Sequence, residues 1–97
     1  MDYDADAAST KGAELFDLMK PDWAPKIDRR RINMLSPTDC IVGQLYGEFK
    51  KALPSLPVLH SRERQIEHAV RLPDGRPDLN EAFVAAWNRR IDERLAA

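Results

Sequence analysis

The chain has 97 residues, 43% of them hydrophobic and 32% charged, which suits one soluble domain and leaves no room for two cores. Its 15 basic and 16 acidic residues give a net charge of -1, so there is no global field to hold nucleic acid or an anionic membrane. A single cysteine and two histidines exclude an internal disulfide and fall short of a structural zinc site. We therefore expect neither a metal nor a cofactor.

The sequence also argues against a membrane-spanning or secreted protein. Its longest uncharged apolar run is only a few residues, far below the roughly 18–20 residues that span a bilayer. The first residues lack the basic and apolar blocks of a signal peptide. We therefore expect a cytoplasmic protein.

The N-terminal residues differ in composition from the remainder of the chain. Residues 1–9 carry three aspartates and no basic residue, which predicts a flexible acidic tail ahead of a single helical domain over residues 10–97. Ser9 or Thr10 is the expected N-cap of the first helix, because a hydroxyl accepts hydrogen bonds from the free amides of a first turn. This helix is expected over residues 10–20, where a proline follows.

The next two segments are separated by a strong helix-start signal. Two prolines and a basic run over residues 21–34 predict short helical turns and loop, with Trp23 and Ile27 anchored in the core. Ser36 then predicts the cap of a helix over residues 37–52, with a proline at its first position. The apolar side chains of this helix recur at helical spacing and share one core face. They are Ile41, Val42, Leu45, Phe49 and Leu53.

The C-terminal half contains two more expected helices. Residues 52–60 are apolar but hold two prolines, which predicts an extended or turn segment. Ser61 is the expected cap of a short helix reaching about residue 72, and residues 79–95 carry large apolar side chains at helical spacing. No run of alternating β-branched residues is present. We therefore predict an all-α bundle of about four helices, with the helix over residues 37–52 at its centre.

Two glycines in that central helix need an explanation. Gly43 and Gly47 lie four residues apart, and each costs a helix interior about 0.5–1 kcal/mol relative to alanine. With Cys40 they form a strip of small residues on the side away from the core face, where another backbone can approach closely. Two interpretations stay open: one of the protein's own helices fills the strip, or a partner or second copy docks there.

The densest basic cluster consists of Arg29, Arg30 and Arg31. The planar guanidinium donates two parallel hydrogen bonds, which suits phosphate or carboxylate recognition. We predict a partner-binding surface made of these arginines and the exposed parts of Trp23 and Tyr46, because Arg, Trp and Tyr concentrate at interface hot spots. The alternative is a solvated turn in which the arginines pair with the acidic tail or with Asp22 and Asp28.

Residues that carry catalysis are scarce. Cys40 near a helix N-terminus, with His60 or His68 as a base, would be the elements of a thiol- or histidine-dependent enzyme. No Gly-rich phosphate loop, nucleophile motif or Glu/His metal spacing accompanies them. We therefore expect a non-enzymatic protein, with this enzyme as the remote alternative.

Three short motifs resemble small proteins encoded by actinobacteria and their phages. They are the W-x-x-x-I-D element at residues 23–28, the C-I-V-G-Q-L-Y-G run at residues 40–47 and the L-N-E-A-F run at residues 79–83. The resemblance covers most of residues 13–95. It implies a genomic setting and assigns no activity or site.

The sequence therefore predicts a small non-enzymatic phage or phage-derived accessory protein of a bacterial host. We expect it to act by binding a host macromolecule, in the first place a protein, or a second copy of itself. The alternative is a nucleic-acid-binding regulator that uses residues 29–31 with Lys50 and Lys51. Such binding would depend steeply on salt, because neutralised phosphates release counterions.

Overall fold

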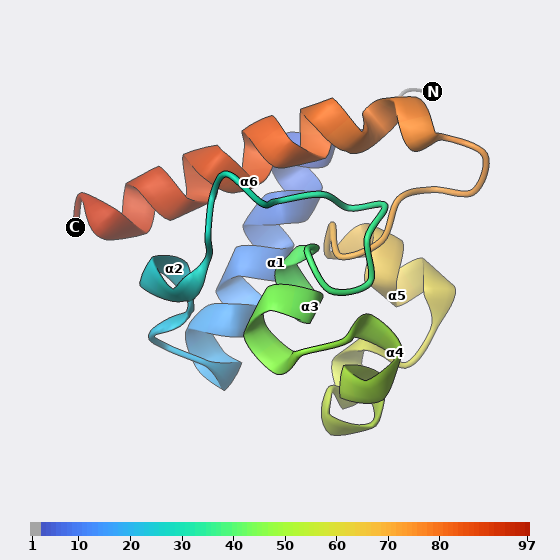
Figure 1. Ribbon diagram of the computed structural model, residues 1–97, viewed down its shortest axis with the longest axis horizontal. Coiled ribbons are helices and arrows are strands. Elements are labelled where there is room, and N and C mark those ends of the chain that lie inside the picture. Colours follow the sequence, from blue (N-terminus) through green and yellow to red (C-terminus); the bar gives the residue numbers. More distant parts are fainter. Residues whose placement is uncertain (1–2) are drawn as a thin grey trace.

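The computed structural model describes residues 3–97 and contains only helices, turns and loops in that range (Figure 1). Two long helices, α1 (Ala5–Met19) and α6 (Asn80–Leu95), cross each other. The short elements between them are α2 (Trp23–Lys26), α3 (Ile41–Tyr46), α4 (Phe49–Ala52), the 3₁₀ turns η1 (Leu53–Ser55) and η2 (Pro57–Leu59), α5 (Arg62–Glu67) and the 3₁₀ turn η3 (Pro77–Leu79). The all-α prediction is confirmed, with shorter helices than expected.

Helix α1 begins earlier than the sequence predicts. The carboxylate of Asp4 accepts a hydrogen bond of 2.9 Å from an amide of the first turn and so serves as the N-cap. Tyr3 stacks on Phe83, with the ring centroids 5.1 Å apart. The prediction of a flexible tail over residues 1–9 is therefore wrong from Tyr3 onward, because an aspartate of the presumed tail caps the helix. Residues 1–2 lie outside the described residues.

The first turn of α1 is held against α6. Ser9 and Thr10, predicted as caps, lie inside the helix, and both hydroxyls donate to the carbonyl of Asp6, at 2.9 and 3.0 Å. The carboxylate of Asp6 lies 3.0 Å from Arg89 Nη2 and 3.3 Å from Arg90 Nη1. Asp6, which composition assigned to a tail, therefore pairs with two basic residues of α6.

An aromatic cluster fills the core beside α1 and α6. Phe16, Trp23 and Trp87 are completely buried, and the two tryptophan rings meet edge to face with centroids 5.7 Å apart. Trp87 Nε1 donates to the carbonyl of Ala69 and Trp23 Nε1 to the carboxylate of Asp17, both at 2.9 Å. The large apolar area removed from water here, at ~25 cal/mol per Å², makes this cluster the main stabilising element of the fold.

Two predicted C-terminal helices are present. Helix α6 matches the expected range over residues 79–95, apart from a start one residue later. None of the helices in the described part of the chain has the length and apolarity needed to cross a membrane. Ser61 caps α5 as predicted, because its hydroxyl accepts the Arg64 amide at 3.2 Å. This helix ends at Glu67 rather than near residue 72, because Ala69 has a φ of 56°, outside the helical region.

The predicted central helix over residues 37–52 is broken into a turn, α3 and α4. The hydroxyl of Ser36 accepts the Asp39 amide at 3.2 Å and closes a turn ahead of α3. Gly47 has a φ of 99° and donates its amide to the carbonyl of Gly43 at 2.7 Å, which ends α3. The prediction of one continuous Gly-containing helix is wrong, because Gly47 supplies a conformation that L side chains rarely adopt.

Candidate functional site

The predicted basic cluster is largely neutralised by the protein itself. Arg29 Nη1 lies 2.7 Å from the carboxylate of Asp92 in α6, and Arg31 Nη2 lies 2.6 Å from the carboxylate of Asp39. Arg30 is exposed, and its guanidinium has no partner within the described part of the chain. Arg29 and Arg31 therefore pair with the protein's own carboxylates, as the alternative predicts, but the predicted partners are wrong. The partners are Asp92 and Asp39 rather than the acidic tail, Asp22 or Asp28.

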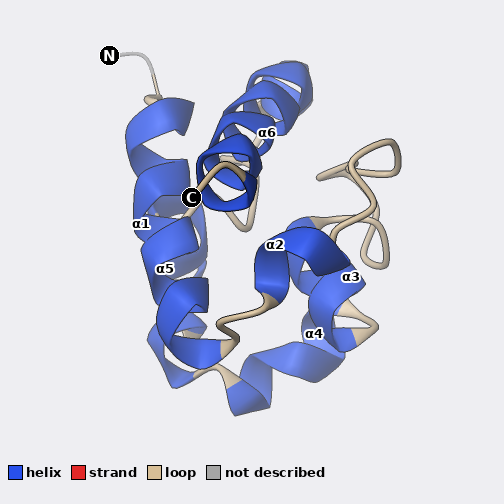
Figure 2. Ribbon diagram, turned by 90° about the vertical axis from the view of Figure 1, so that its left-hand side faces the viewer, coloured by secondary structure: helices blue, strands red, loops and turns tan. Residues whose placement is uncertain are grey.

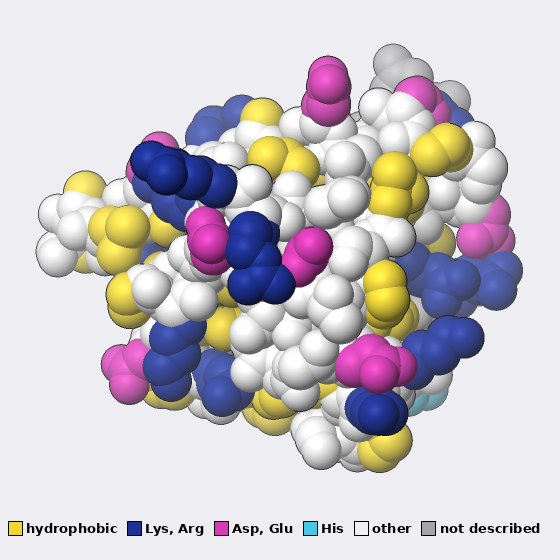
Figure 3. Space-filling model, viewed as in Figure 1, with side chains coloured by type: hydrophobic (Ala, Val, Ile, Leu, Met, Phe, Trp, Pro, Cys, Tyr) yellow, Lys and Arg dark blue, Asp and Glu magenta, His cyan; other side chains and the backbone are white. Residues whose placement is uncertain are grey.

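The lysines predicted to extend the cluster lie elsewhere. Figure 1 shows the loop with residues 29–31 beside α6, whereas α4, which carries Lys50 and Lys51, is at the opposite edge of the molecule. Lys51 Nζ lies 3.6 Å from the carboxylate of Glu48. Figure 3 shows basic and acidic side chains interspersed over this face. The five basic residues of the nucleic-acid hypothesis therefore do not form one continuous patch.

The two aromatic residues of the predicted partner surface have different environments. Trp23 is completely buried in the aromatic cluster, so the prediction that it presents a surface to a partner is wrong. Tyr46 is half-buried, and the ammonium of Lys20 lies 5.1 Å from its ring centroid. Burial raises the pKa of Tyr46, which keeps its hydroxyl protonated at neutral pH.

The strip of small residues is closed by the protein's own backbone. A methyl group at Gly43 would clash with the Pro37 carbonyl oxygen and would lie 2.7 Å from the Thr38 carbonyl carbon. Gly47 faces open space, and its positive φ explains the glycine. The interpretation of the strip as a docking surface is therefore wrong at Gly43, where a turn of the same chain takes the place of a partner.

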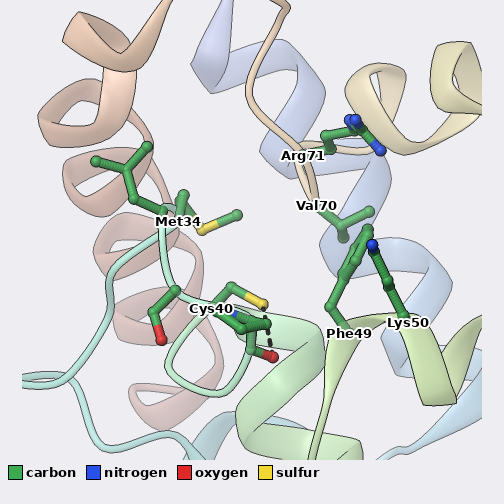
Figure 4. Close-up of a pocket in the computed structure, with 9 residues that line it drawn as sticks. Met34, Cys40, Phe49, Lys50, Val70 and Arg71 are labelled. Carbon is green, nitrogen blue, oxygen red and sulfur yellow. Dashed lines mark hydrogen bonds between the residues drawn. The ribbon is translucent and has the colours of Figure 1, made fainter.

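Sequence analysis missed a groove between the loop over residues 34–37, helix α4 and the loop over residues 70–77. Its deeper part, which we call the anchor cavity, has a volume of about 220 Å³. Its apolar floor is formed by Met34, Cys40, Phe49 and Val70, with Lys50 and Arg71 at the rim (Figure 4). A shallower hollow of about 320 Å³, which we call the channel, shares part of this lining and continues along residues 71–77.

The charges around the anchor cavity are unbalanced. Among the described residues that line it, two are basic and none is acidic. Within residues 3–97 the Lys50 ammonium has no ion-pair partner, and Arg71 Nη1 donates only to the neutral Gln65 Oε1, at 3.3 Å. In the channel, by contrast, Asp74 lies 2.6 Å from Arg62. The rim of the anchor cavity therefore carries a local positive charge that a ligand can neutralise.

The thiol that lines this cavity is buried and caps a helix. Cys40 is 3% exposed, and its sulfur accepts the Gly43 amide at 3.3 Å as the N-cap of α3. Burial raises the pKa of the Cys40 thiol, which disfavours the reactive thiolate. His60 and His68 bond to backbone carbonyls of their own turns, and neither lines the cavity. Nor do three or more metal-binding side chains come together anywhere in residues 3–97.

Comparisons with known proteins provide no relative from which a function could be transferred. No protein-family model, curated protein or solved structure matches the chain. The resemblance to small proteins of actinobacteria and their phages therefore stays a prediction.

Proposed function

We propose that the chain is a small non-enzymatic binding protein that acts in the bacterial cytoplasm by holding a segment of another protein in the groove. The observation that carries this proposal is the position of Leu35. Its side chain is 59% exposed and lines both the anchor cavity and the channel. Leu35 thereby extends the apolar lining of the anchor cavity onto the surface, and contiguous exposed apolar surface marks protein interaction sites.

The surroundings of the groove support a protein partner over a small-molecule ligand. The anchor cavity, at about 220 Å³, is smaller than the roughly 300–1,000 Å³ of most ligand pockets, and the channel, at about 320 Å³, is only at the lower end of that range. It accommodates one large side chain, and the channel beside it provides room for the residues that follow. Loops held on a rigid scaffold often carry such binding surfaces.

The motifs at residues 23–28, 40–47 and 79–83 support a phage or phage-derived accessory protein whose partner is a host protein. This step rests on the resemblance, because small phage proteins of this kind commonly act on host proteins. A second copy of the chain is the other partner that the sequence leaves open, and a mass measurement in solution distinguishes the two.

Photo-crosslinking tests the proposal. A photoreactive amino acid replaces Leu35 in one protein and Leu18, the most exposed leucine of α1 at 83%, in a matched control. We expect one protein of an actinobacterial lysate to be crosslinked at Leu35 and not at Leu18. Leu35→Asp should abolish its capture and Leu18→Asp should not, while both variants keep the melting temperature of the parent.

Two outcomes would overturn the proposal. One is capture of the same protein from both positions, since the groove would then contribute no selectivity. The other is a captured protein that binds Leu35→Asp as well as it binds the parent.

A further inference from the structure

The lining of the anchor cavity defines the chemistry of what it can hold. Phe49 and Val70 form an apolar floor with Met34 at one side (Figure 4), so the cavity favours an apolar side chain that loses its contact with water there. Cys40 closes the bottom with a buried, neutral thiol. The innermost part of the groove therefore selects for apolarity and size.

The rim selects for charge. Lys50 lies beside Phe49 and Arg71 lies above Val70, both across from Met34 and Cys40 (Figure 4). A carboxylate between two cations gains charge-assisted hydrogen bonds, which are about twice as strong as neutral ones. An anionic group next to an apolar one would therefore satisfy floor and rim together.

The neighbouring charges show that this positive rim is local. Arg62 and Asp74 form an ion pair of 2.6 Å at the channel, and Lys51, adjacent in sequence to Lys50, lies 3.6 Å from Glu48. The cations around the groove are thus balanced except at the anchor cavity. Complementary charge at that point increases specificity and the rate of association more than total affinity.

The channel sets the shape of the occupant. It shares Met34, Leu35 and Arg71 with the anchor cavity and continues past Pro73 to Pro77. The two hollows therefore adjoin each other along a shared wall, which fits a chain that passes over the surface and places one side chain in the anchor cavity.

From this geometry we propose that the groove binds an extended acidic segment of the partner protein, with one large apolar side chain in the anchor cavity and a neighbouring carboxylate between Lys50 and Arg71. This inference rests on the proposed function and identifies the kind of partner segment. Nucleic acid fits less well, because an anchor cavity of about 220 Å³ with two cations offers neither a basic track for a backbone nor an exposed aromatic platform for bases.

Fluorescence polarisation with a short labelled peptide tests this inference directly. The probe contains one leucine flanked by glutamates, and two comparison peptides replace either the glutamates by glutamines or the leucine by glycine. The full-length protein should bind the probe. Its affinity for each comparison peptide should be lower by about tenfold or more. Binding of the probe should also weaken as salt is added.

Variants of adjacent lysines provide the matched control. Lys50→Glu and Arg71→Glu place a negative charge at the rim and should each weaken probe binding by about tenfold or more. Lys51→Glu makes the same change one residue away, outside the cavity lining, and should leave binding unchanged. Lys50→Arg, which keeps the charge, should bind the probe more tightly than Lys50→Glu does. Unchanged thermal unfolding confirms that the exposed substitutions leave the fold intact.

The results separate this inference from the proposed function. Equal affinity for the glutamate and glutamine peptides would overturn the proposal that the segment is acidic. An equal loss of probe affinity in the Lys50→Glu and Lys51→Glu proteins would do the same. So would tighter binding of a single-stranded oligonucleotide that depends on Lys50. If capture of the host protein requires Leu35 but tolerates Lys50→Glu and Arg71→Glu, the proposed function stands and only this inference fails.

Discussion

Different interactions stabilise the two long helices and the region over residues 34–77. Helices α1 and α6, which we call the scaffold together with Trp23, are joined by buried aromatic rings and by ion pairs such as that of Arg94 with Asp17, at 2.8 Å. The region over residues 34–77 consists of helices of four to six residues linked by turns. Figure 2 shows α2, α3 and α4 on one side of the molecule and α1 and α5 on the other.

This difference indicates where stability and binding are located. Short helices gain little from their own hydrogen bonds and depend on packing for their stability. The short helices of residues 34–77 leave hollows between them. The groove is one of these, and loops form both of its sides. Binding surfaces of this kind are usually found in the less stable parts of a fold. We therefore expect substitutions in the scaffold to change the free energy of unfolding most and substitutions in the groove to change binding most.

The largest effect is expected for Trp87→Ala. Trp87 is completely buried and donates a hydrogen bond to the Ala69 carbonyl, so its removal leaves a cavity and an unpaired acceptor and should reduce the free energy of unfolding by about 3–5 kcal/mol. Phe49→Ala, at the half-buried floor of the groove, should cost less than half as much. Denaturant unfolding of both variants measures the contrast. Equal losses would show that the two regions are equally important for stability.

A smaller effect is expected for Gly47→Ala. Nothing lies within 4 Å of the added methyl, so the change tests conformation alone, at a φ of 99°. We expect a loss of about 1–3 kcal/mol in the free energy of unfolding, together with weaker binding in the groove, because α4 carries the rim lysine. Gly43→Ala is the comparison, since its added methyl meets backbone atoms instead. An unchanged melting temperature for Gly47→Ala would contradict the conclusion that the positive φ of Gly47 ends α3.

Arg29 and Arg30 provide a matched pair within the basic cluster. Arg29 Nε donates to Asn88 at 2.7 Å and Nη1 lies 2.7 Å from Asp92, so Arg29→Ala should lower the free energy of unfolding by about 1 kcal/mol. Arg30→Ala removes the same charge from an exposed side chain and should change the free energy of unfolding by less than about 0.5 kcal/mol. Thermal unfolding of both proteins in one buffer measures the difference. A reversed order would show that the cluster is not tied to the scaffold.

The smallest effect concerns the pH dependence of the scaffold. The hydrogen bond from Arg94, with a weaker contribution from Trp23, lowers the pKa of Asp17. A lowered pKa in the folded state gives stability that is present above the ordinary value of about 3.9 and is lost as the pH falls through the folded pKa. Because the side chain is 42% exposed, solvent screening limits the contribution to about 0.5 kcal/mol at pH 7.

Asp17→Asn tests this contribution. The difference in the free energy of unfolding between the parent and this variant should shrink as the pH is lowered from 7 to about 2. Glu14→Gln removes a carboxylate from the same helix that makes no ion pair within the described chain, and it should show no such trend. A difference for Asp17→Asn that stays constant with pH would contradict the role of this carboxylate.

How well the sequence predicted each element depends on where the determining interaction lies. Helix α6 was predicted within one residue of its start, because Phe83, Trp87 and Ile91 recur at helical spacing within one segment. The start of α1 was missed because Asp4 and Ser9 are equally good caps by residue type, and contacts distant in sequence, such as the stacking of Tyr3 on Phe83, accompany the earlier one. That contact joins opposite ends of the chain.

The groove was missed for the same physical reason. Its walls are separated by more than thirty residues in the sequence, at Met34 and Val70, and both belong to loops without periodicity. Leu35, Phe49 and Lys50 were visible in the sequence, but helical spacing assigned Phe49 to a core face. Gly47 was the local signal that could have warned against this assignment, because a glycine within a helix pattern also marks a helix end.

The buried tryptophans allow the scaffold to be followed by spectroscopy independently of the groove. Trp23 and Trp87 are in contact at an interplanar angle of 84°, and neither lines the anchor cavity or the channel. Their coupled near-ultraviolet circular dichroism and their emission therefore report on the packing of the scaffold. A ligand that occupies the groove should leave both signals unchanged, whereas unfolding should remove both, so one sample reveals whether binding and folding are independent.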